Sequence, residues 1–246
     1  MSSRAYVNQE CDYNGQIVTL YQTYGPFIST ACAQGDGYND ALSDEGCTKY
    51  DNGKPPVGCV AVATAQIMAF HRYPSTFNWT AMPNREGSDE TARLMADIGR
   101  HVDMKYECDG SSANTNKAAQ VLRNAYGYRS ANWNDEYQAN IVFNNLKAGR
   151  PVILRGGRNA GWWIIGIYKD GHAWVCDGVH LYTDYICHKW EESDPYVDNH
   201  DWAFNGSTMF LHVNWGWGGD YNAYFLAGNF NPGDRDYNYK LGMIVD

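Results

Sequence analysis

The stretch from Val57 to Pro74, VGCVAVATAQIMAFHRYP, decides the fold. From Cys59 to Arg72 it contains no glycine and no proline, and alanine stands at positions 61, 63, 65 and 69. Because alanine is the best helix former and Pro74 cannot continue a helix, we predict a helix over residues 59–72. Its residues are apolar nearly all round, so this helix should be buried at the centre of the protein.

The chain changes in character on either side of this helix. Before it, residues 23–58 are rich in turn-forming pairs such as Gly25-Pro26, and a β-like stretch occurs at residues 16–21. After it, apolar residues recur at helical spacing over about residues 89–100, 115–125 and 137–148. Beyond residue 150, apolar runs predict strands separated by glycine turns, at 152–154, 162–168, 173–176 and 209–213.

Helices that precede strands along the chain, without alternating with them, favour an α+β fold. We expect residues 1–246 to form a single domain with two lobes, a helical lobe over about 1–130 and a sheet lobe over about 131–246. Hydrophobic residues make up 44% of the chain and charged residues 19%, a composition typical of a globular protein and not of a disordered one.

Charge and hydrophobicity exclude several kinds of partner. The net charge is −9 and no basic patch is visible, which disfavours a nucleic-acid partner. No run of 18 apolar residues occurs, so the sequence predicts no membrane span. The first residues, Met1-Ser2-Ser3-Arg4, lack the apolar region of a signal peptide. We therefore expect either a cytosolic protein or an exported one whose signal has been removed.

The seven cysteines leave the redox state open. Their odd number leaves at least one thiol free. The sequence contains no C-x-x-C pair, which argues against a structural zinc site. In an oxidising compartment Cys32 could pair with Cys47, or Cys176 with Cys187. Reduced thiols buried in the core are an equally good interpretation.

Cys59 is the first candidate for chemistry, because it stands at the first turn of the predicted helix. The partial positive charge of a helix N-terminus stabilises a thiolate and lowers the pKa of the thiol. This arrangement would give a nucleophile at neutral pH. The alternative is a small buried residue at a helix start.

Two further strings could complete a catalytic site. Gly171-His172-Ala173-Trp174-Val175 places a histidine at the mouth of an apolar strand, where its ring could act as a general base. In HVNWGWGG, residues 212–219, Asn214 could accept a hydrogen bond from that imidazole, and Trp215 could shield the bond from water. A half-buried structural histidine and a turn chosen for packing are the alternatives.

Together the three strings resemble the streptopain family of papain-like cysteine peptidases. VGCVAVATAQIMAFHRYP is similar to that family's active-site helix, GHAWVCDGV to its histidine segment and HVNWGWGG to its tryptophan segment. The stretches VDMKY and NAYGY also resemble the family, and the matches run in family order over residues 34–226.

The resemblance implies a fold and a set of site residues. The fold would be the two-lobed papain-like one, with a helical N-terminal lobe, an antiparallel sheet in the C-terminal lobe and the active site in the cleft between them. Cys59 matches the nucleophile and His172 the catalytic histidine. The other matching positions are Gln34 for the oxyanion hole, Asn214 and Trp215 beside the histidine, and Ser112 and Gly171 for substrate contact.

The resemblance also implies an activity. It predicts a cysteine endopeptidase that acts on proteins or peptides through a thiolate–imidazolium pair and an acyl-enzyme, with no metal or organic cofactor. An apolar side chain two residues before the cut would be preferred. Family members are bacterial proteins made with a signal and an inhibitory propeptide, so the sequence would be the mature part of a zymogen that is secreted, periplasmic or bound at the cell surface.

Some features depart from the family or leave other functions open. Residues 181–205 look like an insertion that could extend the sheet, border the cleft or bind something, and the segment after Pro232 lacks streptopain's long glycine-rich loop. Val62 replaces a hydroxyl residue of the family helix. The alternatives are an acyl transferase or amidase on the same scaffold, a catalytically dead relative used for binding or inhibition, and an aromatic-rich carbohydrate-binding module.

Overall fold

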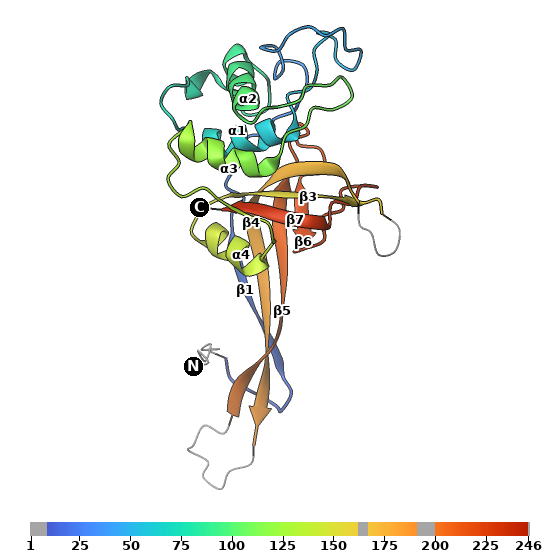
Figure 1. Ribbon diagram of the computed structural model, residues 1–246. Coiled ribbons are helices and arrows are strands. Elements are labelled where there is room, and N and C mark those ends of the chain that lie inside the picture. The colour runs from blue at the N-terminus through green and yellow to red at the C-terminus, as the bar shows by residue number, and fades with distance from the viewer. Residues whose placement is uncertain (1–8, 162–166, 191–199, 246) are drawn as a thin grey trace. The chain divides into compact units, whose positions relative to one another are not determined.

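Most helices lie in the first half of the chain and most strands in the second half (Figure 1). The computed structural model describes residues 9–161, 167–190 and 200–245. In chain order the elements are β1 (Ile17–Tyr24), α1 (Cys59–His71), a 3-10 turn (Trp79–Ala81), α2 (Asp89–His101), α3 (Thr115–Asn124), β2 (Asn132–Asn134), α4 (Ala139–Lys147), β3 (Val152–Asn159), β4 (Tyr168–Lys189), β5 (His200–Asn214), β6 (Ala223–Leu226) and β7 (Tyr239–Val245).

The predicted helices all form, with ends within two residues of those expected. The strands follow the order β2-β7-β3-β4-β5-β6, and β1 pairs with β4. Three of them, β2, β6 and β7, were not expected from the sequence, although β7 pairs antiparallel with both β2 and β3. Most of the strand expected at 162–168 lies outside the described residues.

The chain divides into two compact units. Residues 24–179 and 211–246 form the larger, and residues 1–23 and 180–210 form the smaller. The expected change from helices to strands near residue 130 falls inside the larger unit. That unit is built around α1, in which residues 60–68 are all buried. α1 packs against α2, α3 and β3, and Figure 1 shows α1, α2 and α3 on one side of β3 and β7, with α4 on the other.

The backbone fixes where α1 begins. Gly58, just before the helix, has φ 87, which only glycine adopts without strain. A Cβ at this position would also lie 2.7 Å from Met104 Sδ, so the space is closed to a larger residue. No side chain caps the first turn, which leaves its N–H groups available to other acceptors. Cys59 therefore starts the helix beside N–H donors that no side chain caps.

A disulfide braces the loop that leads to α1. Cys47 and Cys108 are bonded, with an S–S distance of 2.03 Å. Neither of the pairings considered from the sequence forms, because Cys32 and Cys176 are free thiols buried in the core. Burial raises the pKa of Cys32 to about 12, so this thiol stays protonated. Connectivity depends on the fold, and chain spacing could not predict it.

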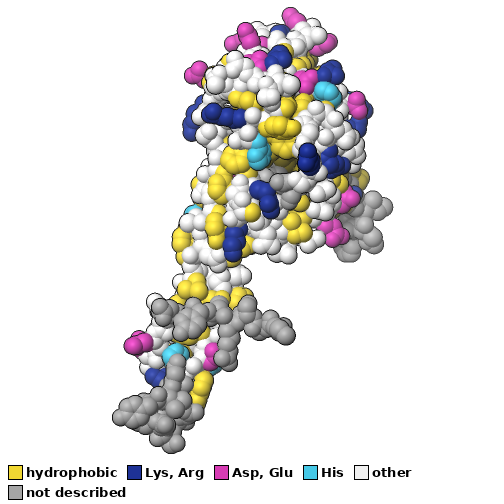
Figure 2. Space-filling view, turned by 90° about the vertical axis from the view of Figure 1, so that its left-hand side faces the viewer, with side chains coloured by type: hydrophobic (Ala, Val, Ile, Leu, Met, Phe, Trp, Pro, Cys, Tyr) yellow, Lys and Arg dark blue, Asp and Glu magenta, His cyan; other side chains and the backbone are white. Residues whose placement is uncertain are grey.

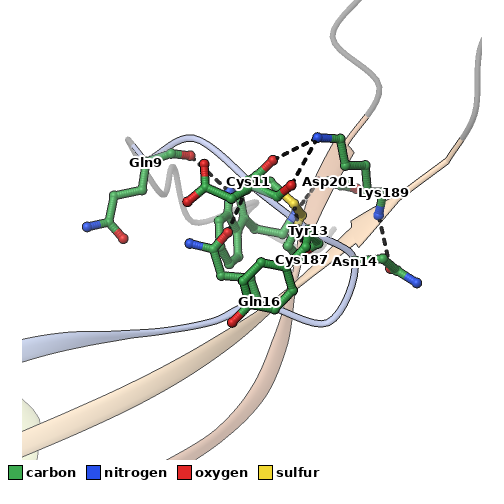
Figure 3. The surroundings of a disulfide bond; sticks show 10 residues. Gln9, Cys11, Tyr13, Asn14, Gln16, Cys187, Lys189 and Asp201 are labelled. Carbon is green, nitrogen blue, oxygen red and sulfur yellow. Dashed lines mark hydrogen bonds between the residues drawn. A yellow bond between two sulfur atoms is a disulfide. The ribbon is translucent and has the colours of Figure 1, made fainter.

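The smaller unit contains β1 and the distal parts of β4 and β5. The described part of the suspected insertion, residues 181–190 and 200–205, continues these two strands and so extends the sheet. A second disulfide, Cys11–Cys187, ties the N-terminal segment to β4 (Figure 3). Around it, Lys189 Nζ donates to the Cys11 carbonyl at 3.1 Å, and Cys187 N–H donates to the Gln16 carbonyl at 2.9 Å.

This smaller unit buries little apolar surface. β1 alternates between exposed and half-buried positions, and no helix belongs to the unit among the described residues. Several of its large hydrophobic side chains are exposed, namely Tyr13, Ile17, Tyr21, Tyr182, Trp190 and Phe204. Figure 2 shows hydrophobic side chains on its surface, in the lower part of the view. Strand pairing and the disulfide must therefore supply much of its stability.

We predict that the two disulfides act on separate regions. Replacing Cys11 and Cys187 by alanine should lower the local opening free energy of residues 9–23 by about 2–4 kcal/mol, because the open chain regains entropy that the bond removes. Hydrogen–deuterium exchange of the non-reduced protein measures this change. The matched control replaces Cys47 and Cys108, and should leave exchange in residues 9–23 unchanged. Equal protection of residues 9–23 with and without the Cys11–Cys187 bond would contradict the prediction.

Candidate active site

Cys59 contacts the strand that carries His172. Its Sγ accepts a hydrogen bond from the N–H of Ala173 at 3.4 Å. Ala173 lies in β4, where it pairs with Arg155 of β3, and His172 pairs with Gly156. The structure therefore brings the start of α1 to the residue next to His172, although 113 residues separate Cys59 from His172 in the sequence.

Two opposing effects act on the pKa of the Cys59 thiol. Burial raises its pKa, because a thiolate is poorly solvated there. The backbone N–H groups of Ala173, Val60 and Cys59 itself lower the pKa by donating to the sulfur. Burial is the larger influence, so the isolated thiol stays protonated. The three donors would stabilise a thiolate once another group takes the proton.

His172 makes one hydrogen bond that defines its protonation pattern. Its Nε2 lies 2.8 Å from the backbone carbonyl oxygen of Trp215. A carbonyl oxygen can only accept, so Nε2 must carry a proton. In the neutral ring this leaves Nδ1 as the nitrogen with a free lone pair. Nδ1 can then accept a proton from a nearby donor.

Aromatic rings enclose the imidazole on several sides. His172 is only 7% exposed. The ring centroid of Trp217 lies 4.8 Å from that of His172, the ring of Tyr237 at 5.3 Å and the ring of Trp215 at 6.0 Å. Burial lowers the pKa of His172 to about 4, against the opposing effect of the Trp215 carbonyl and in the same direction as the charge of Arg235. The rings thus keep water from the bond to Trp215.

Asn214 does not contact the imidazole in the way expected from the sequence. Its Nδ2 donates to the carbonyl of Thr30 at 2.7 Å, and its Oδ1 accepts from the N–H of Gly216 at 3.2 Å. The acceptor that faces His172 is instead the backbone of the next residue, Trp215. The reason is that Asn214 is buried inside the turn, where both ends of its amide are used. Asn214 therefore holds the turn that presents the carbonyl.

Gln34 lies beside the start of α1. Its carbonyl accepts from the N–H of Val57 at 3.0 Å, two residues before the nucleophile candidate. The neighbouring Cys32 carbonyl accepts from the N–H of Gly218 at 2.9 Å, which ties this segment to the tryptophan turn. Gln34 and Trp217 both line a pocket of about 530 Å³. The expected oxyanion-hole residue is thus on the wall of a cavity large enough for substrate side chains.

The two remaining candidates lie near the start of α1 and beside His172. Ser112 pairs with Lys105 through two backbone hydrogen bonds of 2.9 Å, and the neighbouring Ser111 carbonyl approaches Gly58. Gly171 is exposed and directly precedes His172. A Cβ at Gly171 would lie 2.6 Å from the Tyr168 hydroxyl, so a side chain there would clash. Their contact with substrate stays a prediction.

Sequence reasoning missed part of this site. Trp217 and Tyr237 pack around His172, and Arg235 lies over Trp217. The sequence did point to the region of Trp217, because this residue belongs to the Trp-Gly-Trp string already singled out. Nothing in the sequence pointed to Tyr237 or Arg235, because no pattern marks the segment between β6 and β7 as part of the site.

The described part of the chain contains neither a metal cluster nor a membrane helix. No group of three or more His, Cys, Asp or Glu side chains within residues 9–161, 167–190 and 200–245 is arranged to hold a metal ion. Over the same ranges, no helix is both long and apolar enough to cross a membrane.

Comparison with known proteins gives one family. The profile described as the Peptidase C10 family matches residues 32–77 and 75–225. Streptopain of Streptococcus pyogenes is 27% identical in an alignment 220 positions long, which covers 71% of this chain and 46% of streptopain. The thiol protease/hemagglutinin PrtT of Porphyromonas gingivalis is 24% identical, over 72% of this chain and 21% of its own length. The chain thus spans less than half the length of these curated relatives.

The chain shares its fold with two solved structures. Active wild-type interpain A cysteine protease of Prevotella intermedia superposes with a TM-score of 0.67 and 23% identity, over 90% of this chain and 94% of that one. A prointerpain A fragment from the same organism gives a TM-score of 0.62, also at 23% identity, and covers 90% of this chain and 71% of that one. The expected α+β, papain-like fold is confirmed.

We predict that His172 titrates far below an ordinary histidine when the sulfur is absent. In a Cys59→Ala variant, nuclear magnetic resonance of the labelled ring should give a pKa near 4, because burial disfavours the imidazolium. The same protein unfolded in urea is the control and should give about 6.5. A folded-state pKa at or above the unfolded value would contradict the burial of the ring.

Proposed function

Because the chain belongs to the Peptidase C10 family, we propose that it is a cysteine endopeptidase that hydrolyses peptide bonds through Cys59 and His172. The observation that carries the proposal is the hydrogen bond from Ala173 N–H to Cys59 Sγ, at 3.4 Å. It joins the helix start to the residue beside the buried histidine. Two segments far apart in the chain then offer a nucleophile and its base to the same peptide bond.

The first step is the formation of the nucleophile. His172 Nδ1 takes the proton of the Cys59 thiol and gives the thiolate–imidazolium pair. Burial favours the neutral forms of both groups, as the raised pKa of Cys59 and the lowered pKa of His172 indicate. The proton therefore moves as substrate binds and the sulfur attacks. The N–H groups around the sulfur and the Trp215 carbonyl at Nε2 stabilise the charges that form.

The second step is attack on the peptide carbonyl. A bond forms between Sγ and the carbonyl carbon, and the oxygen becomes an oxyanion. The side-chain amide of Gln34 and the backbone N–H of Cys59 donate to that oxygen. The backbone hydrogen bond between Gln34 and Val57, two residues before Cys59, supports this role. One such donor contributes on the order of 3 kcal/mol to stabilising the transition state.

The remaining steps release the two products. The imidazolium of His172 gives its proton to the leaving amine as the C–N bond breaks, which leaves an acyl-enzyme on Cys59. Water then attacks the acyl carbon while His172 takes its proton, and the S–C bond breaks. Trp215 serves through its carbonyl, and Asn214 serves by holding the turn that carries this carbonyl. No step requires a metal or an organic cofactor.

Substrates and cellular setting are further parts of the proposal. We propose protein or peptide substrates that pass Ser112 and Gly171, with an apolar side chain preferred two residues before the cut. The disulfides Cys11–Cys187 and Cys47–Cys108 support a protein of an oxidising compartment, and so export from a bacterial cell. The likeness to a prointerpain A fragment supports synthesis as a precursor with an inhibitory propeptide.

Replacing the sulfur tests the proposal directly. Cys59→Ala should lower kcat/KM on casein by at least about 1,000-fold, because no group can then form the acyl-enzyme. Cys176→Ala is the matched control, since that buried thiol lies outside the site, and it should still cleave. Circular dichroism checks that both variants fold.

Two outcomes would contradict the assignment. Casein cleavage by Cys59→Ala at the unmodified rate would remove Cys59 as nucleophile. Transfer of the acyl group to added amines in preference to water, seen by mass spectrometry of the products, would make the protein an acyl transferase instead. Iodoacetamide should label Cys59 and spare the buried Cys32 and Cys176.

A further inference from the structure

A fixed positive charge lies behind the aromatic rings that cover His172. The guanidinium carbon of Arg235 is 4.5 Å from the ring centroid of Trp217. The ring of Trp217 is in turn 4.8 Å, centroid to centroid, from the imidazole of His172. The ring of Trp217 therefore contacts both the cation and the catalytic imidazole.

The loop between β6 and β7 holds Arg235 in this place. The backbone N–H of Arg235 donates to the Pro232 carbonyl at 3.2 Å, and the backbone N–H of Tyr237 donates to the Phe230 carbonyl at 3.2 Å. Phe230 is fully buried, so this end of the loop is anchored in the core. Tyr237 itself packs on His172, at 5.3 Å between ring centroids. The backbone thus delivers both Arg235 and Tyr237 to the imidazole.

Three carboxylates in the described part of the chain line a pocket together with Arg235, but none of them is ion-paired with it. Within residues 9–161, 167–190 and 200–245, no Asp or Glu oxygen forms an ion pair with Arg235. Asp170, in the strand that carries His172, is instead paired with Arg158 at 2.8 Å. Asp234 and Asp236 lie beside Arg235 in the same loop and are exposed.

The remaining titratable groups near His172 come from two other places. Cys59 approaches from α1, and the hydroxyl of Tyr237 comes from the loop. Burial raises the pKa of Tyr237 to about 12, so its hydroxyl is neutral at ordinary pH. Arg235 is therefore the cation whose charge the imidazole feels, and the charge of Arg235 lowers the pKa of His172.

We propose that Arg235 is a positioning residue for His172, which holds Trp217 over the imidazole and keeps a positive charge close to it. The inference rests on the proposed function and adds to it. A nearby cation makes an imidazolium a stronger acid, so His172 gives its proton to the leaving amine more readily. A guanidinium keeps its charge at every pH at which the enzyme could work, so the effect is constant.

A charge series at position 235 tests this inference through the pH profile of kcat/KM. The acidic limb of that profile reports the protonation of His172 in the free enzyme, because the imidazole must be neutral to take the proton of the thiol. Removing the cation in Arg235→Met should raise that pKa and move the limb to higher pH by about half a unit, since an exposed charge is partly screened. Arg235→Glu should move the limb further in the same direction, and Arg235→Lys should restore it close to the unmodified position.

Lys49→Met is the matched control. Lys49 lines the same pocket as Arg235 and carries the same charge, but it lies over Tyr50 and not over Trp217. Its removal should leave the acidic limb in place. Acidic limbs that coincide for Arg, Lys, Met and Glu at position 235, with only kcat lowered, would overturn the inference and leave Arg235 with a structural role only.

A second readout needs no activity. In the Cys59→Ala background, nuclear magnetic resonance follows the pKa of His172 with and without Arg235→Met. The inference requires a higher pKa in the double variant, and an unchanged pKa overturns it. If the unmodified protein cleaves no peptide, the proposed function fails while this titration still decides whether Arg235 acts on His172.

Discussion

The hydrogen bond between His172 Nε2 and the backbone carbonyl of Trp215 is the contact on which the site depends. At 2.8 Å it commits one ring nitrogen to a proton and leaves the other free for the sulfur. A backbone acceptor cannot ionise, so this orientation does not change with pH as it would with a carboxylate partner. The surrounding rings of Trp215, Trp217 and Tyr237 keep water from competing for the bond.

The position of that carbonyl is set by contacts that join distant parts of the larger unit. Asn214 binds the Thr30 carbonyl, and Gly218 binds the carbonyl of Cys32. On the other side, Gln66 in the middle of α1 accepts from the N–H of Cys32 at 3.3 Å. The central helix, the segment that leads to Gln34 and the tryptophan turn are therefore one connected framework. This framework holds both the start of α1, which carries Cys59, and the turn whose carbonyl accepts from His172.

The sequence was sufficient for the helices, for several of the strands and for the α+β, papain-like fold, whereas the roles of Cys59 and His172 stay predictions. The alanine-rich run after Gly58 allows only a helix, and the strings around Cys59 and His172 are distinctive. It was insufficient where a backbone group makes the contact. The pattern suggested that the side chain of Asn214 accepts from His172, but the backbone carbonyl of Trp215 is the acceptor. Disulfide pairing and the extension of β4 and β5 depend on contacts between distant segments. Arg235 acts across space through Trp217, which no local pattern reports.

The state of the two ring nitrogens of His172 is the most direct measurement of this account. Nitrogen-15 chemical shifts of the selectively labelled ring, recorded in the folded protein above pH 6, distinguish the two neutral tautomers and the imidazolium. The account predicts a proton on Nε2, with Nδ1 unprotonated in the neutral ring. A neutral ring with its proton on Nδ1 and a bare Nε2 would contradict the bond to Trp215, and with it the proposed path of the proton from Cys59.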